Sequence, residues 1–141
     1  MNPLLDPILL APVFAWFFSQ LLKNIFFWYK DKKISKKYVF TDGGLPSSHS
    51  AVMTALTTAI FLTEGLTPLF YVSAVVSLVI FRDATGVRLE TAKQAKRINQ
   101  LFKEFDSHEI ALKELIGHTR KQVIAGIVVG LVVTIILFFL L

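Results

Sequence analysis

The sequence of 141 residues contains no cysteine and little that interrupts regular structure. The absence of cysteine excludes thiolate zinc sites, disulfide scaffolds and cysteine nucleophiles. Only 7 glycines and 5 prolines are present, which excludes a collagen-like chain. Charged residues make up 18%, against about 25% in typical soluble domains. A disordered chain is also excluded, because such chains are rich in charge and poor in large apolar residues.

Apolar residues are abundant instead, at 54% of the chain, and the mean hydropathy is +0.60. Four apolar segments stand out, at residues 7–29, 50–63, 66–81 and 123–141. A helix that crosses a bilayer needs about 20 apolar residues, with roughly 17 as a lower limit, so the first and last segments are long enough. The two shorter segments are joined at Glu64-Gly65, which we interpret as a hairpin tip. We predict an all-α, polytopic membrane helix bundle of about four spans, forming one membrane-embedded domain over residues 1–141.

The basic residues predict how this bundle is oriented. Fourteen of the fifteen Lys and Arg residues fall within residues 30–47 and 82–121. If all four segments cross, both stretches lie on one side, and the positive-inside rule makes that side cytoplasmic. We therefore expect a multi-pass protein of the cell membrane with both termini outside. The net charge of +5 then needs no nucleic acid to explain it, and affinity for anionic lipid headgroups remains open.

The polar stretch at residues 88–117 is predicted to be helical. An apolar stripe at roughly helical spacing consists of Leu89, Ala92, Ile98, Leu101, Phe102 and Phe105. Asp106 and Glu109 form a capping-box pattern that would open a second short helix from Ser107 to Ile116, with Leu112, Leu115 and Ile116 buried. We expect two amphipathic cytoplasmic helices between spans three and four, covering the bundle.

Two predicted helix starts carry a histidine. Ser47-Ser48-His49 stands where the second span begins, and a serine-capped helix start offers free N–H groups to an anion. His118-Thr119 stands where the fourth span begins, with Gln122 one turn further on, able to orient the ring of His118. Taken singly, each is better explained as the start of an ordinary capped membrane helix.

Taken together, the two helix starts suggest phosphoryl chemistry. Both lie on the predicted basic face, where one imidazole could attack a phosphoryl group and the other protonate the leaving oxygen. His108, the third histidine, is expected to be solvated. On the same face, Asp83 and Arg88 either pair with each other, or Arg82 and Arg88 clamp phosphate while Asp83 positions a histidine or a metal. The metal signal is weak because no second carboxylate accompanies Asp83.

Three motifs resemble the divergent branch of the type 2 phosphatidic acid phosphatase and vanadium haloperoxidase superfamily. They are residues 43–50 (GGLPSSHS), 83–88 (DATGVR) and 117–130 (GHTRKQVIAGIVVG). The resemblance implies His118 as nucleophile, His49 as general acid and then base, and Ser47 and the Ser48 N–H as phosphate ligands. It implies a phosphohistidine intermediate and no metal or organic cofactor.

The chain also departs from the parent pattern. Gln122 stands where the parent family has the aspartate that orients the nucleophile. Leu112 stands where an arginine is expected, so the adjacent Lys113 could substitute for it. The parent Lys-x6-Arg-Pro motif is absent, which leaves Lys37, Arg82 or Arg88 as the remaining phosphate clamps.

The resulting prediction is a membrane phosphohydrolase that acts on a lipid phosphate or an isoprenyl diphosphate. Its expected partners are the bilayer and a phosphorylated amphiphile, with self-association left open. Haloperoxidase activity is not expected, because nothing marks a soluble scaffold that holds vanadate. The alternative is a non-catalytic membrane protein that binds anionic headgroups or a protein partner, and a third hypothesis is a soluble helical protein.

Overall fold

The computed structural model describes residues 6–31, 43–105, 110–114 and 116–141, and these residues form helices joined by short connections. The helices are α1 (Pro7–Asp31), α3 (Ser48–Glu64), α4 (Pro68–Thr85), α5 (Val87–Glu104) and α6 (Arg120–Leu140). No strand occurs in these ranges, so the all-α prediction is confirmed.

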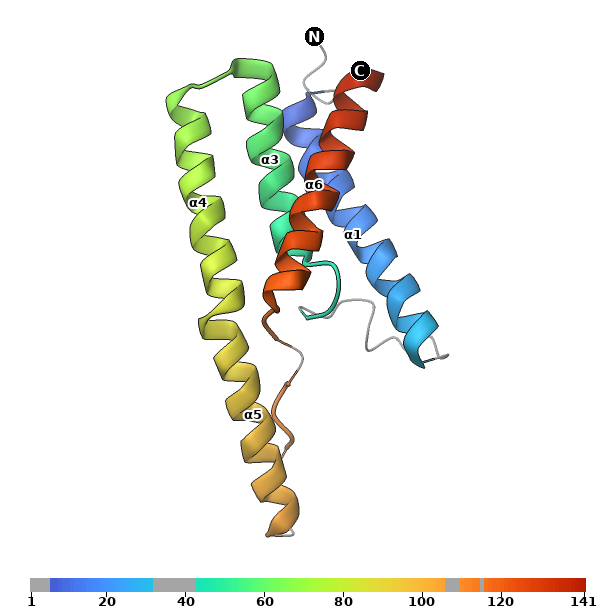
Figure 1. Cartoon of the computed structure of the whole chain (residues 1–141), viewed down its shortest axis with the longest axis vertical. Helices are drawn as coiled ribbons and strands as arrows, with labels where there is room; N and C mark the ends of the chain where they lie inside the picture. Colours follow the sequence, from blue (N-terminus) through green and yellow to red (C-terminus); the bar gives the residue numbers. More distant parts are fainter. Residues whose placement is uncertain (1–5, 32–42, 106–109, 115) are drawn as a thin grey trace.

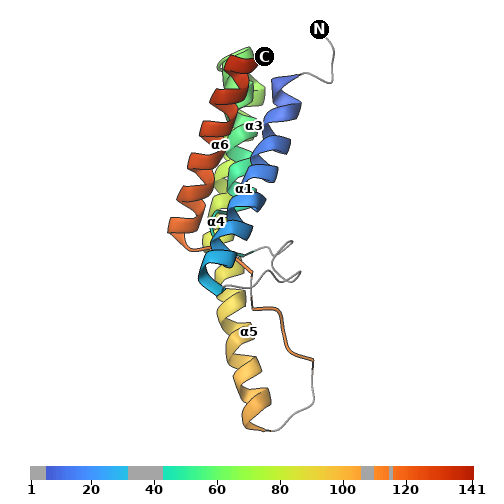
Figure 2. The same ribbon diagram turned by 90° about the vertical axis from the view of Figure 1, so that its right-hand side faces the viewer.

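Helices α1, α3, α4 and α6 pack beside one another and run up and down (Figure 1). The described ends of the chain and the turn at Gly65 lie at one level, and the starts of α3 and α6 lie at the other. Gly65 takes a positive φ of 76°, which lets the chain turn between α3 and α4 as predicted. Figure 2 shows α5 extending beyond the ends of α1, α3 and α6, with residues 110–114 beside it.

Three helical stretches in the described part are long and apolar enough to cross a membrane: Pro7–Tyr29, Pro68–Glu104 and Arg120–Leu140. The second of these combines α4 with α5. Together they identify a polytopic helical membrane protein. Helix α3 has 17 residues, which corresponds to about 25 Å at 1.5 Å per residue, against roughly 30 Å of hydrocarbon. Its crossing of the bilayer therefore remains a prediction, although it packs against α1, α4 and α6.

Small residues form the interior of the bundle, and large apolar residues point outward. The buried positions of α1 recur every fourth residue, and α3 and α6 contribute similar small side chains: Ala11, Ala15 and Ser19 from α1, Ala51, Ala55 and Ala59 from α3, and Gly126 and Gly130 from α6. Small side chains let helices approach closely, which is how helices associate where lipid removes the usual hydrophobic drive.

The closest approach is between α6 and the start of α3. A β-carbon on Gly126 would collide with the carbonyl oxygen of Ser47, and one on Gly130 would collide with the carbonyl oxygen of Ala51. The absence of a side chain at these two glycines therefore permits the close packing of α6 on α3. Helix α6 therefore packs directly against the start of α3, which carries His49.

The polar stretch after α4 differs from the prediction. Helix α5 forms, but it continues α4 away from the bundle instead of covering it (Figure 1). The expected second helix at residues 107–116 is wrong for residues 110–114 and 116, which are not helical; residues 107–109 and 115 lie outside the described ranges. Leu112, expected to be buried, is exposed.

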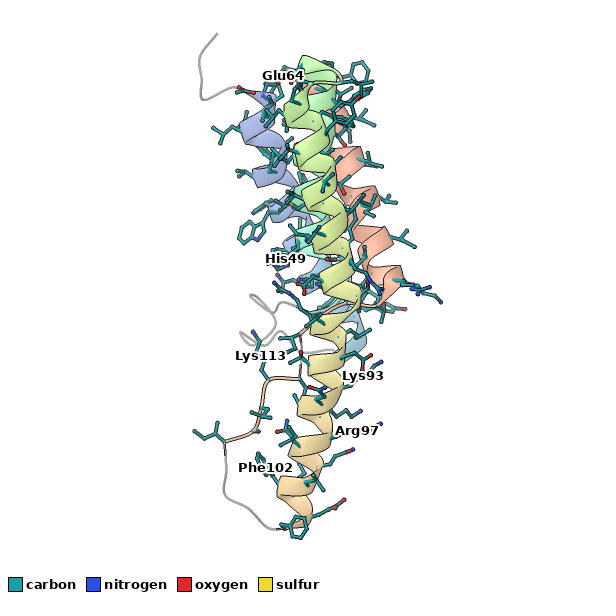
Figure 3. All side chains as sticks on the ribbon, turned by 90° about the vertical axis from the view of Figure 1, so that its left-hand side faces the viewer. His49, Glu64, Lys93, Arg97, Phe102 and Lys113 are labelled. Carbon is teal, nitrogen blue, oxygen red and sulfur yellow. The ribbon has the colours of Figure 1, made fainter. Side chains whose placement is uncertain are left out.

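Asn99 explains why this segment is not a helix. Its side-chain Nδ2 donates to the carbonyl oxygen of Leu112 at 2.8 Å, and its Oδ1 accepts from the Leu112 N–H at 2.7 Å. These bonds use the backbone groups that a helix would need for its own ladder. Figure 3 shows Phe102 on the side of α5 that faces this segment.

Candidate functional site

The start of α3 presents the Ser47-Ser48-His49 motif at the end of the bundle from which α5 extends. Ser47 is the N-cap and is fully buried, and its hydroxyl oxygen accepts from the N–H and the hydroxyl of Ser50. Ser48 is buried and its hydroxyl has no partner in the described part of the chain. His49 is exposed in the first turn. The motif therefore places an imidazole and a buried hydroxyl at a helix N-terminus, where an anion is favoured.

The start of α6 is capped by Thr119. The Thr119 hydroxyl accepts from the Gln122 N–H, and the Gln122 side-chain oxygen accepts from the Thr119 N–H at 2.8 Å. This capping box uses the oxygen of Gln122, the residue predicted to orient His118. His118 itself immediately precedes the cap.

Two backbone hydrogen bonds hold the helix starts together. The Ser47 N–H donates to the carbonyl oxygen of Gln122 at 3.0 Å, which joins the α3 motif to the first turn of α6. The His118 N–H donates to the carbonyl oxygen of Ala84 at 2.9 Å, which joins the segment before α6 to the last turn of α4. Gly117, with φ 75°, permits this approach, because a β-carbon there would collide with the backbone of Arg88 and Leu89.

The result is a small cavity of about 90 Å³ between α3, α4, α5 and the start of α6. Both histidines line it, together with the ends of the two helices that meet at Gly86. The complete lining is His49, Ile80, Asp83, Ala84, Arg88, Gly117 and His118. Figure 3 shows His49 at this level of the bundle, above the α5 extension.

Asp83 and Arg88 form an ion pair across the junction between α4 and α5. The Arg88 Nε donates to the Asp83 Oδ2 at 2.6 Å. Of the two alternatives drawn from the sequence, the structure therefore contains the pairing of Asp83 with Arg88. Because both residues also line the cavity, the arginine lies where it could exchange this carboxylate for a phosphoryl oxygen.

The imidazole of His118 is held neutral by its surroundings. Only 2% of the residue is exposed, and neither ring nitrogen has a hydrogen bond of standard geometry within the described residues. Burial, followed by the positive field of Lys23 and the proximity of His49, lowers the pKa of His118 from 6.5 to about 4. The nearby Gly44 backbone and Gln122 side chain act weakly in the opposite direction. A neutral ring has the free lone pair that a nucleophile requires.

Lys23 is a functional candidate that the sequence analysis did not select. It lies in α1 and is 1% exposed, and its charge acts on His118. Gly44, with φ 105°, passes directly over it, since a β-carbon on Gly44 would lie 3.5 Å from Lys23 Cδ and 3.0 Å from the Phe27 ring. The available signal was a single lysine inside an apolar span, because an ionisable group at membrane depth is usually functional.

Comparisons with known proteins identify the family. A model of a family described as the Divergent PAP2 family matches residues 4–133. The chain belongs to the Divergent PAP2 family. The chain is 35% identical to the uncharacterized membrane protein YuiD of Bacillus subtilis (strain 168), and the alignment covers 93% of each chain. No solved structure gives a significant match. The resemblance on which the sequence analysis relied is therefore confirmed.

Two of the remaining predicted cations, Arg82 and Lys113, are not part of the cavity lining. Arg82 is exposed in the last turn of α4, and Lys113 is exposed in the segment beside α5. Lys37 lies outside the described residues. Of the cations, Arg88 lines the cavity and Lys23 acts on His118 from α1.

No cluster of three or more metal-ligating side chains (His, Cys, Asp or Glu) occurs in the described residues. The prediction that no metal or organic cofactor is needed remains a prediction.

Proposed function

We propose that this protein is a membrane phosphohydrolase that removes phosphate from a lipid phosphate or an isoprenyl diphosphate through a phosphohistidine. Membership of the Divergent PAP2 family relates the chain to phosphatases. The observation that carries the proposal is that His49 and His118, far apart in the sequence, line the same cavity beside an arginine.

In the first step, a ring nitrogen of His118 attacks phosphorus while the bond between phosphorus and the leaving oxygen breaks. The protonated imidazole of His49 gives its proton to that oxygen, so a neutral alcohol or a monophosphate leaves. The new N–P bond makes the His118 ring cationic. Arg88 and Lys23 offset the negative charge of the phosphoryl oxygens.

In the second step, the now neutral His49 takes a proton from water, and the resulting hydroxide attacks phosphorus. The N–P bond breaks and its electron pair returns to His118, which releases inorganic phosphate and regenerates both residues. Ser47 and the N–H of Ser48 stand at the α3 N-terminus, and the roles assigned to them are to hold phosphoryl oxygens.

The membrane setting supports an amphiphilic substrate. The α1 and α6 faces carry a wholly apolar groove of about 560 Å³, lined among others by Phe14, Phe18 and Val132. The basic residues of α5 extend from the end of the bundle that holds the cavity (Figure 1). By the positive-inside rule, we place this end in the cytoplasm of a multi-pass protein of the cell membrane, with no role for nucleic acid.

The alternative is a membrane protein that binds anionic headgroups or a protein partner without turnover. One observation favours it. Gln122, which replaces the orienting aspartate of the parent pattern, has its side-chain oxygen engaged by the Thr119 N–H. His118 then lacks the carboxylate that would stabilise its positive form.

The deciding experiment measures phosphate release by the detergent-purified protein. Substrates are phosphatidic acid, phosphatidylglycerophosphate and an isoprenyl diphosphate, and the variants are His118→Asn and His108→Asn. We expect release from at least one substrate by the wild type and by His108→Asn, and no release by His118→Asn. An acid-labile, alkali-stable phosphoenzyme should form on the wild type and on His108→Asn, but not on His118→Asn.

Absence of release from every substrate, with retained binding of the same lipids, would favour the non-catalytic alternative. Equal release by the wild type and His118→Asn would remove His118 from the mechanism. Carbonate washing of membranes tests the setting separately, since an integral protein stays in the pellet.

A further inference from the structure

A line of exposed apolar residues runs along the outer edge of the molecule, on α4 and α5. In α4 it consists of Leu69, Val72, Val76 and Val79, whose exposed fractions range from 42% to 62%. In α5 and its C-cap it includes Val87, Ile98, Leu101 and Phe105, whose exposed fractions range from 38% to 80%. We call these eight residues the α4–α5 seam.

The seam has the spacing of a coiled coil. Its α4 positions are separated by three, four and three residues. Below Gly86 the positions 87, 91, 94, 98, 101 and 105 alternate between steps of four and three, with the uncharged Thr91 and Gln94 completing the series. Alternation of three and four keeps side chains on one stripe that faces a partner helix. The halves are joined by two steps of four through Asp83, an insertion that locally unwinds such a pair.

The packing within the chain uses other faces of the same helices. Helix α4 packs on α3 through Ser73 and Ser77, and the Ser77 hydroxyl lies 3.0 Å from the hydroxyl of Thr57. Helix α5 holds residues 110–114 through Asn99. In Figure 3, where α4 and α5 stand in front, no other described helix crosses this edge. The described helices therefore do not cover the seam.

Lipid can cover the α4 half of the seam but not the α5 half. Helix α5 extends beyond the ends of α1, α3 and α6 (Figure 2), and Ile98, Leu101 and Phe105 are exposed on it. With the bundle in the bilayer as proposed, these residues face water. Exposed apolar side chains aligned in water mark an interaction surface. None of the seven charged residues of α5 falls on the seam, and Asp83, between the two halves, is paired with Arg88 of the same chain.

We propose that the seam binds the seam of a second copy of this chain, as a parallel pair about a two-fold axis along the membrane normal. Copies inserted in the same orientation present α4 and α5 in parallel, and a two-fold interface uses the same surface twice. In the parallel register, Glu90 flanks Ala95 of the second copy, and Arg97 flanks Phe102. On α5 no like charges meet, and Asp83, which lies on the stripe at the junction, is paired with Arg88 of its own chain. The proposal does not depend on the proposed phosphatase activity.

The absence of cysteine in the native sequence allows a direct test by single-cysteine crosslinking. The seam variants are Val76→Cys and Leu101→Cys. The matched controls are Leu78→Cys on α4 and Lys96→Cys on α5, which are also exposed but lie on the opposite side of each helix. Native membranes are oxidised with copper phenanthroline and the products are separated without reductant. We expect a dimer at both seam positions, at least fivefold more abundant than at the controls.

A second variant tests the pairing independently of crosslinking geometry. Adding Ile98→Glu to Val76→Cys should reduce its dimer at least threefold, because two carboxylates would oppose each other on the seam. Equal dimer at seam and control positions would mean random collision and would overturn the proposal. Products of another mass would identify a different protein partner and would also overturn it. A third result would also overturn the proposal. If the seam cysteines form no dimer, and anionic lipid vesicles alone protect them from a water-soluble maleimide, α5 binds the membrane surface instead.

Discussion

The starts of α3 and α6 are similar in sequence and different in surroundings. Each presents a histidine beside a hydroxyl cap, and both lie at the same end of the bundle. His49 follows its cap, within the first turn, and is exposed. His118 precedes its cap and is buried, with a backbone hydrogen bond to the end of α4. The two histidines thus differ both in their position relative to the cap and in their exposure, although both line the cavity.

In the proposed mechanism, this difference suits the two side chains to different roles. An exposed imidazole keeps access to water and can exchange protons, as a general acid and base must. A buried imidazole beside a lysine is held neutral, as a nucleophile must be. The assignment of His118 as nucleophile and His49 as proton carrier therefore rests on burial as well as on the family resemblance.

The largest expected effect comes from replacing each histidine in turn. His118→Asn should lower turnover by at least about 10⁴-fold and prevent phosphoenzyme formation. His49→Asn should lower turnover of lipid substrates by about 10²- to 10⁴-fold, the usual contribution of a general acid. With p-nitrophenyl phosphate, whose leaving group needs no proton, His49→Asn should still form the phosphoenzyme. Rapid-quench experiments measure phosphoenzyme formation in both variants. If both variants lost phosphoenzyme formation equally, the two histidines would not differ in role.

Replacing Lys23 measures how much its positive charge contributes to activity while both histidines are retained. Lys23→Met keeps the length of the side chain but removes the charge, so we expect kcat/KM to fall by about 10- to 100-fold as one charged interaction with the phosphoryl group is lost. The pKa of His118 should rise at the same time, because Lys23 lowers it. Lys121→Met, an exposed cation at the start of α6, is the matched control. An unchanged kcat/KM in Lys23→Met would exclude this lysine from the site.

Lys23 also shows what the sequence could and could not provide. The apolar segments, the two histidine motifs and the turn at Gly65 were all predictable, because each depends on local composition and capping. The buried position of Lys23 depends on the register of α1 against the loop at Gly44, which no local pattern contains. Its place in the sequence, near the lysines of residues 30–47, made it resemble an ordinary charge at a helix end.

The predicted helix after α5 was wrong for a related reason. The Asp106 and Glu109 pattern is a local signal for a helix start, and residues 110–114 are nevertheless not helical. The competing interaction is the paired hydrogen bonding of Asn99 with Leu112, two residues that lie on different elements. Local capping signals cannot anticipate a side chain that satisfies the same backbone groups from outside the segment.

A smaller effect is expected from the contact that holds the two helix starts together. Gly126→Ala places a β-carbon against Ser47, and Gly130→Ala places one against Ala51, further from the cavity. Each should cost roughly 1–3 kcal/mol through overpacking. Only Gly126→Ala should also lower kcat/KM, by about tenfold, because it shifts the α3 start relative to His118. Thermal unfolding in detergent and steady-state kinetics measure the two effects, and an equal loss of kcat/KM in both variants would contradict the link between this contact and the site.

The last prediction concerns pH, and it tests the neutral state of His118 directly. A folded pKa near 4 against 6.5 for an unfolded histidine means that the unfolded chain binds the extra proton between these values. The contribution of His118 to stability is therefore complete above pH 6.5 and is lost as the pH falls toward 4, by roughly 3 kcal/mol in all. His118→Asn should unfold with a weaker dependence on pH over this interval than the wild type. The acid limb of kcat/KM should likewise lie near pH 4 in the wild type and move upward in Lys23→Met, since kcat/KM reports the free enzyme. An acid limb near pH 6.5 that His49→Asn abolishes and Lys23→Met leaves in place would mean that the exposed ring, and not the buried one, must be neutral for catalysis.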